Sequence, residues 1–342
     1  MPLSHTRHTL YNIQALRAIA ALLVILHHSL PHYEVMGGKL PFIKAISSWG
    51  FIGVDIFFII SGYIMAYTTF DKPRSLKSAT VFTKHRLLRI YLGYWPFFFA
   101  MFYILYKKHR LDGLDLWGSF WLTNDNMFQL VLPVSWSLSY ELYFYILFAI
   151  TLLLPVTALK RFFPVFTGVF ALVTYYLYLH PHIPQHIFYS HFLLEFFSGV
   201  LLFIYRERLM HNWLIPIALI TAFLAYFYGI SFETKNGLPR IATFGTGALM
   251  VVFLALVAEF KLNLKASRSI VSLGDASYTL YLSHLVLLEL FYYVGIRDLF
   301  TSQNSILLPF LGLISIIFIC IIFSLLYYRY IEKPVYQTAI RL

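Results

Sequence analysis

The sequence predicts an all-α integral membrane protein, built as a single bundle of about ten transmembrane helices. Its 342 residues are 60% hydrophobic and 19% aromatic, but only 12% charged, whereas soluble domains carry about 25% charged residues. The apolar residues form runs of about twenty, the length that a helix needs to cross a hydrocarbon core of about 30 Å. A soluble fold could not bury this much apolar surface, so a bilayer must cover it.

The first apolar run opens the series of expected helices. It follows a short basic head, as in a secretory signal peptide, but no small-residue cleavage site comes after it. It also contains Arg17 and His28, and we therefore expect a retained first helix. Each later apolar run predicts one further helix, and the fifth is short. The expected spans are residues 13–32, 50–68, 88–106, 136–155, 165–180, 188–205, 213–230, 241–258, 271–293 and 307–328.

Basic residues are distributed unevenly between the two sets of expected loops. Most of the 26 Lys and Arg residues lie in segments on the side of the N-terminus, including Arg7 and the stretch 72–89. Because cytoplasmic loops carry such an excess, we expect both termini in the cytoplasm and the connection 107–135 outside. The excess of basic residues in cytoplasmic loops thus accounts for the formal charge of +11. Nucleic acid is therefore not an expected partner. No repeat or long loop divides the chain, so residues 1–342 are expected to form one domain.

Ionisable side chains within the expected helices are few. A charge at mid-bilayer costs about 2.5–3.5 kcal/mol even on a lenient scale, and such residues normally face a functional pathway. At a rise of about 1.5 Å per residue, His28, Asp55 and Glu141 reach a similar depth near the outer side, which predicts a shared site. Asp55 could instead pair with a basic residue at the interface. Three further residues admit structural roles, hydrogen bonding or packing: Glu195, Glu289 and His284.

One face of the first expected helix combines two polar residues with small side chains between them. Arg17 and His28 are about three turns apart and point from the same face. Ala20, Ala21 and Val24 lie between them, so this face either accommodates an elongated ligand or allows close packing of another helix. His27 points roughly 100° away from His28 and is not expected in the site.

A second basic group lies at the expected inner end of the third helix. Arg86 and Arg89 share a helix face, so they could hold phosphate oxygens together. Tyr91 and Trp95 follow them closely. The same residues could instead form a basic membrane anchor with an aromatic belt, and the pattern leaves both interpretations open.

Metal chemistry is not expected. Cys320, the only cysteine, lies within an apolar run, so neither a disulfide nor a cysteine zinc site is available. Four histidines gather in an outer loop, where the sequence favours a solvated loop over a metal site. They are His180, His182, His186 and His191.

A series of motifs resembles the acyltransferase-3 family of membrane acyltransferases, nearly from end to end. The motifs are LRAIAALLVILHH with Arg17 and His28, GVDIFFIISGY from Gly53 to Tyr63, the pair Arg86 and Arg89, SWSLSYELYF from Ser135 to Phe144, LGDASYTLYLSH from Leu273 to His284, and RYIEKP from Arg329 to Pro334. Tyr140 and Ser283 stand where many relatives have valine and tryptophan, which affects pocket shape. A chain ending at Leu342 is similar to the short relatives that lack a soluble C-terminal domain and modify capsule, exopolysaccharide or lipid-linked glycans.

The resemblance implies transfer of an acyl group, normally acetyl, from cytoplasmic acyl-coenzyme A to a hydroxyl of a cell-surface or lipid-linked glycan. The expected location is the inner (plasma) membrane of a bacterium, and the expected partners are acetyl-coenzyme A, the glycan and membrane lipids. Residues expected to bind the donor, with the arginines on its phosphates, are Arg17, Ser61, Arg86, Arg89, Tyr91 and Trp95.

His28 would then be the general base on the acceptor hydroxyl. Glu141 or Asp55 would orient its ring, and a serine hydroxyl, from Ser137, Ser139 or Ser61, would stabilise the oxyanion. An acyl-histidine intermediate remains a second route. The rival functions are a glycan transporter or flippase, which predicts internal repeats that the sequence lacks, and a receptor without chemistry, which leaves the intramembrane charges unexplained.

Overall fold

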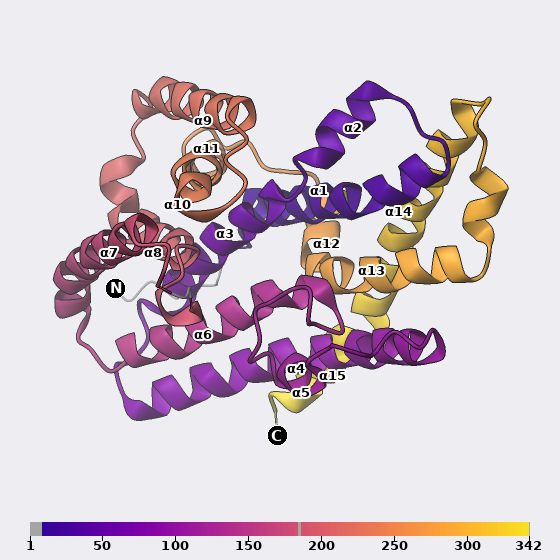
Figure 1. Cartoon of the computed structure of the whole chain (residues 1–342). Coiled ribbons are helices and arrows are strands. Elements are labelled where there is room, and N and C mark those ends of the chain that lie inside the picture. The colour runs from indigo at the N-terminus through magenta and orange to yellow at the C-terminus, as the bar shows by residue number, and fades with distance from the viewer. Residues whose placement is uncertain (1–8, 184–185, 342) are drawn as a thin grey trace.

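A computed structural model describes residues 9–183 and 186–341, and these residues form helices and loops with no β-strand. Arg7, one of the residues expected on the cytoplasmic side, lies outside the described part of the chain. The helices are α1 (Tyr11–Val35), α2 (Pro41–Ser48), α3 (Ile52–Thr69), α4 (Leu76–Lys107), α5 (Leu116–Trp121), α6 (Trp136–Thr151), α7 (Val156–Leu179), α8 (Leu193–Leu209), α9 (Leu214–Ser231), α10 (Gly237–Arg240), α11 (Thr246–Phe260), α12 (Arg268–Asp275), α13 (Ser277–Tyr293), α14 (Leu307–Tyr327) and α15 (Lys333–Ala339) (Figure 1).

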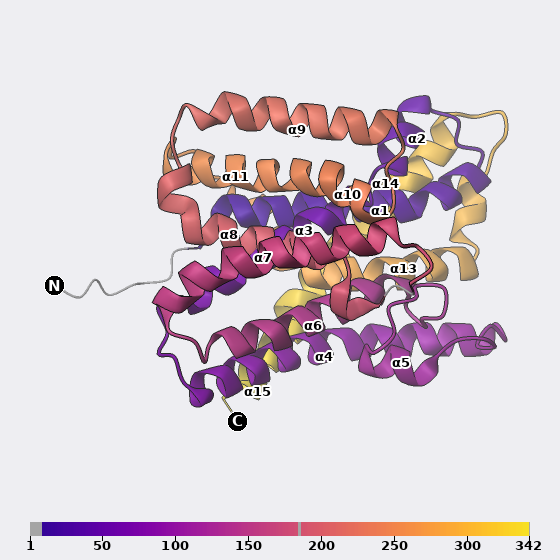
Figure 2. The same cartoon turned by 60° about the vertical axis from the view of Figure 1, so that its left-hand side comes forward.

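The expected all-α membrane architecture is confirmed. Eight helical segments of the described chain are long and apolar enough to cross a bilayer. Each of the other two expected spans also contains a helix, but α6 has 16 residues and α13 has 17, slightly fewer than the about 20 of a full crossing. The long helices lie side by side and run in nearly the same direction (Figure 2).

Two helices begin well before their expected spans. α4 begins at Leu76 rather than at residue 88, and the side chain of Ser75 accepts a hydrogen bond from the amide of Ser78 at its start. α7 begins at Val156 rather than at residue 165, directly after Pro155. The early turns of both helices carry polar and basic residues, so an apolar window misses them. The consequence for function is that Arg86 and Arg89 lie well inside α4 rather than at its end.

α1 is held closely between its neighbours. At its N-terminus the carboxylate of Glu259, from α11, accepts hydrogen bonds from the amides of Tyr11 and Asn12 at 3.0 and 2.8 Å, which satisfies donors that a helix start leaves free. Further along, a side chain at Gly53 of α3 would overlap the carbonyl oxygen of Ala20. The small-residue face of α1 therefore packs against α3 and does not line a cavity.

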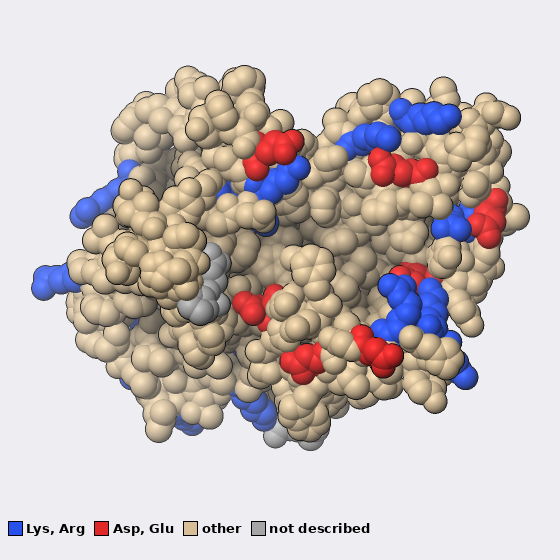
Figure 3. All heavy atoms as spheres, in the orientation of Figure 1, with Lys and Arg blue, Asp and Glu red and all other residues tan. Residues whose placement is uncertain are grey.

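α9 shows what surrounds the bundle. It buries only Ala218, Ala222 and Gly229, whereas large apolar side chains such as Phe223, at 66% exposure, point outwards. Figure 3 shows a broad surface free of charged side chains over the lobe that contains α9 and α11. An apolar face of this extent fits contact with lipid chains.

The connection between α4 and α6 folds back along α4. Its helix α5 begins at Asp115, whose carboxylate accepts hydrogen bonds from the amide of Gly118 and the side chain of Asn124 at 2.8 and 2.9 Å. These contacts lower the pKa of Asp115. The hydroxyl of Tyr91 and the indole of Trp95, both in the middle of α4, donate to backbone carbonyls of α5 at 2.8 and 3.3 Å. The loop is thus part of the packed bundle.

Candidate active site

A cavity of about 110 Å³ lies between α3, α4, α6 and α13, with Arg17 of α1 at its edge. Most of its apolar lining residues come from α3. Its polar wall joins residues that are far apart in the sequence, and all but Ser277 and the tyrosines were expected as donor-binding or catalytic residues. The polar lining consists of Arg17, Ser61, Arg86, Arg89, Ser137, Glu141, Tyr145, Ser277, Tyr278 and Tyr281.

The three arginines give this cavity its charge. Within the described residues, Arg17, Arg86 and Arg89 form no ion pair with a carboxylate. Arg86 packs its guanidinium against the ring of Tyr145, 5.4 Å from the ring centre. Glu141 is the one acidic residue among the described lining residues, and its charge acts on all three arginines. The cavity therefore carries excess positive charge, which an anionic ligand would balance.

Glu141 faces these arginines and not the histidine. Its carboxylate accepts hydrogen bonds from the hydroxyl of Ser61 at 3.1 Å and from the hydroxyl of Tyr145. No hydrogen bond joins Glu141 to His28 in the described part of the chain. The expectation that Glu141 orients the imidazole is therefore not supported by a direct contact.

A second, larger cavity of about 330 Å³ continues from the first towards the end of the bundle where α1 begins. It is formed by α1, α4, the junction of α12 and α13, and the segment that follows α14. Arg17 and Arg89 line both cavities, so their side chains lie at the boundary. The two cavities therefore adjoin at these arginines and together outline a route from this end of the bundle towards its interior.

His28 lies beyond the inner end of this route, next to another histidine. Its Nδ1 is 2.9 Å from the carbonyl oxygen of Val24 and 3.3 Å from Nε2 of His284. A carbonyl only accepts, so the contact with Val24 requires the proton on Nδ1 and leaves Nε2 of His28 with a free lone pair. His284 is fully buried, and its ring centre is 6.0 Å from that of Tyr281, which lines the central cavity. Tyr281 and His284 therefore connect the cavity to His28.

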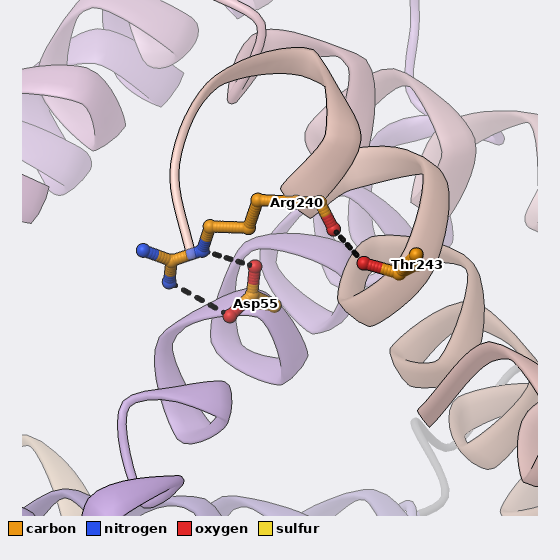
Figure 4. Close-up of polar contacts among 3 residues, drawn as sticks. All are labelled: Asp55, Arg240 and Thr243. Atoms are coloured by element: carbon orange, nitrogen blue, oxygen red, sulfur yellow. Dashed lines mark hydrogen bonds and ion pairs between the residues drawn. The ribbon is translucent and has the colours of Figure 1, made fainter. Parts of the chain in front are cut away.

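Asp55 is engaged in a different contact. Its two carboxylate oxygens accept hydrogen bonds from Nε and Nη2 of Arg240 at 3.0 and 2.8 Å (Figure 4). Asp55 is fully buried and Arg240 is 8% exposed. The bidentate pair links α3 to α10, and no hydrogen bond connects Asp55 with His28 among the described residues. This geometry matches the alternative interpretation, an ion pair with a basic residue.

Three more of the expected site residues lie outside both cavities. The hydroxyl of Ser139 donates to the carbonyl of Asn124 at 2.9 Å. Tyr91 and Trp95 bind α5, as described above. These residues hold the connection 107–135 against α4 and α6. Of the serines considered for the oxyanion, Ser61 and Ser137 are the two that line the central cavity.

The site also contains residues that the sequence did not single out. Tyr145 and Tyr281 lie at helical spacing from Glu141 and His284, so the shared faces of their helices gave a usable signal. Arg240 immediately precedes an apolar span. A buried carboxylate such as that of Asp55 normally pairs with a basic side chain. No local pattern indicates that these two residues meet.

The fold and the cavities define a multi-pass membrane protein with a basic internal site reached from one end of the bundle. The family profile described as an acyltransferase domain, Acyl_transf_3, matches residues 10–328. This match covers nearly the whole chain, and the protein therefore belongs to the acyltransferase-3 family. No curated protein and no solved structure matches the chain.

Proposed function

We propose that this membrane acyltransferase moves an acyl group, normally acetyl, from acyl-coenzyme A to a hydroxyl of a cell-surface or lipid-linked glycan. The observation that carries the proposal is the convergence of Arg17, Arg86 and Arg89 on one cavity without ion-pair partners in the described residues. Guanidinium groups bind phosphate oxygens in bidentate fashion. The diphosphate of coenzyme A supplies the negative charge that the cavity lacks.

The donor enters from the end of the bundle where the larger cavity opens. Coenzyme A is a cytoplasmic cofactor, so this end faces the cytoplasm, and the protein lies in a bacterial inner membrane with both termini inside. The bias of basic residues supports the same orientation. A reporter enzyme fused to the C-terminus and active only outside the cytoplasm would contradict it.

The chemical step requires a base at the far end of the donor. Nε2 of His28 removes the proton of the acceptor hydroxyl while the hydroxyl oxygen attacks the thioester carbon. The new carbon–oxygen bond forms, the carbon–sulfur bond breaks, and the imidazolium returns the proton to the leaving thiolate of coenzyme A. The carbonyl of Val24 fixes the tautomer of His28, since it holds the proton on Nδ1.

The remaining polar groups of the cavity have supporting roles. Ser137 shares a hydrogen bond of 2.8 Å with the hydroxyl of Tyr281, and both hydroxyls also contact the carbonyl of Val134. One of the two hydroxyls would turn away from this carbonyl to donate to the oxygen of the thioester. Glu141 keeps the hydroxyls of Ser61 and Tyr145 directed into the cavity. The ring of His284 packs against the ring of His28, with 5.0 Å between the ring centres.

The experiment uses membranes of cells that make the protein together with their own glycans. Acetyl-coenzyme A labelled in the acetyl group is added, and label is measured in the polysaccharide and glycolipid fractions. We expect covalent label with the wild-type protein and none with an Arg86→Ala/Arg89→Ala variant present at equal amount. Glycan that crosses the membrane without gaining label would contradict the proposal and identify a transporter.

A further inference from the structure

The larger cavity has a lining that the proposed function does not yet use. Beyond the boundary arginines, it is lined by the segment after α14, which contains a π-helical turn at Tyr328–Glu332 and then α15. π-helical turns occur often at functional sites because they redirect side chains. The segment contributes six residues to the cavity wall: Tyr328, Glu332, Lys333, Tyr336, Gln337 and Ile340.

The two cavities differ in volume, and this difference indicates which part of a ligand each can hold. A volume of about 330 Å³ falls within the about 300–1,000 Å³ of sites for compact small molecules. The inner cavity, at about 110 Å³, accepts only a slender group. Coenzyme A has the same division, since a nucleotide is joined through a diphosphate to a narrow pantetheine arm.

We infer that the larger cavity is the site for the adenosine 3′-phosphate half of the donor, and that Lys333 binds the 3′-phosphate. This inference rests on the proposed function. Arg17 and Arg89 lie between the cavities and are therefore assigned to the diphosphate. Lys333 is the other cation among the described lining residues, and it has no ion-pair partner there.

The other side chains of the cavity suit a nucleoside. Tyr328 and Tyr336 are half-buried and offer ring faces for stacking of the adenine base. The hydroxyl of Tyr336 lies 3.5 Å from the carbonyl oxygen of His85 in α4, so α15 is fixed to the bundle. Asp275 lines the same space and can accept hydrogen bonds from the ribose hydroxyl or the adenine amino group.

The test compares coenzyme A with 3′-dephospho-coenzyme A, which differs only in the phosphate assigned to Lys333. Binding of both compounds is measured by calorimetry on the purified full chain in detergent micelles. We expect the wild-type protein to prefer coenzyme A by about tenfold, as fits a charge-assisted contact. Lys333→Gln should remove this preference by weakening the binding of coenzyme A alone.

Arg329→Gln is the matched control. Arg329 belongs to the same segment and is exposed, but it lies against the ring of Tyr330 and does not line the cavity. Its substitution should leave the preference at about tenfold. Equal affinity of the wild-type protein for both compounds, or an unchanged preference in Lys333→Gln, would overturn the assignment but leave acyl transfer intact. Failure of both compounds to bind would overturn the proposed function as well.

Discussion

Substitution of Asp55 by Asn should destabilise this protein without a specific effect on chemistry. The substitution keeps the shape of the side chain but removes the charge that pairs with Arg240 at 2.8 and 3.0 Å in a fully buried position. Removal of one partner from a buried ion pair costs about 3–5 kcal/mol, because the other charge remains buried and unpaired. This range is the upper bound for the Asp55→Asn variant.

A neighbouring carboxyl can reduce that cost. Glu195 is 1% exposed, and its carboxyl group lies beside the ion pair of Asp55 and Arg240. It also interacts electrostatically with Asp55 and Arg240. When Asp55 is neutral, the carboxyl group of Glu195 is the acidic group that remains beside Arg240, and it replaces part of the lost interaction. The double variant Asp55→Asn/Glu195→Gln should therefore lose more stability than the two single variants together.

Thermal melting in detergent, together with transfer from labelled acetyl-coenzyme A, separates the two roles of Asp55. The neutral double variant Asp55→Asn/Arg240→Gln should recover part of the stability and should still transfer acetyl. Loss of the pair between half-buried Arg297 and exposed Asp298, 3.2 Å apart, serves as the control and should cost at most about 1 kcal/mol. An Asp55→Asn variant with unchanged melting and no transfer would refute this reasoning and make Asp55 part of the chemistry.

Two further predictions concern the donor site and the connection 107–135. Arg86→Ala and Arg89→Ala should each weaken the binding of coenzyme A by about 1.5–3 kcal/mol, measured by calorimetry on folded protein, and unchanged affinity in both would make them membrane anchors. The contacts of Asp115 lower its pKa, so its stabilisation of α5 is present above about pH 4, the unfolded value, and is lost as pH falls through the folded value. Hydrogen exchange at the amide of Gly118 should accelerate in that acidic range, and Asp115→Ala should show fast exchange at every pH.

The sequence predicted the architecture well because lipid imposes a simple rule on it. Runs of apolar residues must form helices where no water satisfies the backbone, and every expected span contains a helix. The predicted first residues of α4 and α7 were wrong, because polar residues extend both helices before the apolar run that the prediction used. That error placed Arg86 and Arg89 at a helix end, although they lie within α4 beside the cavity.

The site was only partly predictable. Depth along each helix grouped His28, Asp55 and Glu141 at one level, but neither carboxylate forms a hydrogen bond with His28 among the described residues. Depth does not give the direction in which a side chain points, so it did not separate Asp55 from His28. Direction depends on which helices are neighbours, and the pairing of Asp55 with Arg240 follows from the packing of the turn Ile241–Gly245, directly after α10, against α3. Single-sequence patterns hold little information on such contacts.

The most direct test of the catalytic account is acetyl transfer by His28→Ala compared with His27→Ala. Nδ1 of His27 contacts the carbonyl of Ser47 at 2.9 Å, so the control removes a neighbouring imidazole of the same helix. We predict that His28→Ala lowers transfer by about 10²–10⁴-fold while its affinity for coenzyme A stays close to that of the wild type. His27→Ala should transfer at nearly the wild-type rate. A His28→Ala protein that acetylates glycan at a comparable rate would contradict the account and move the reaction centre away from this residue.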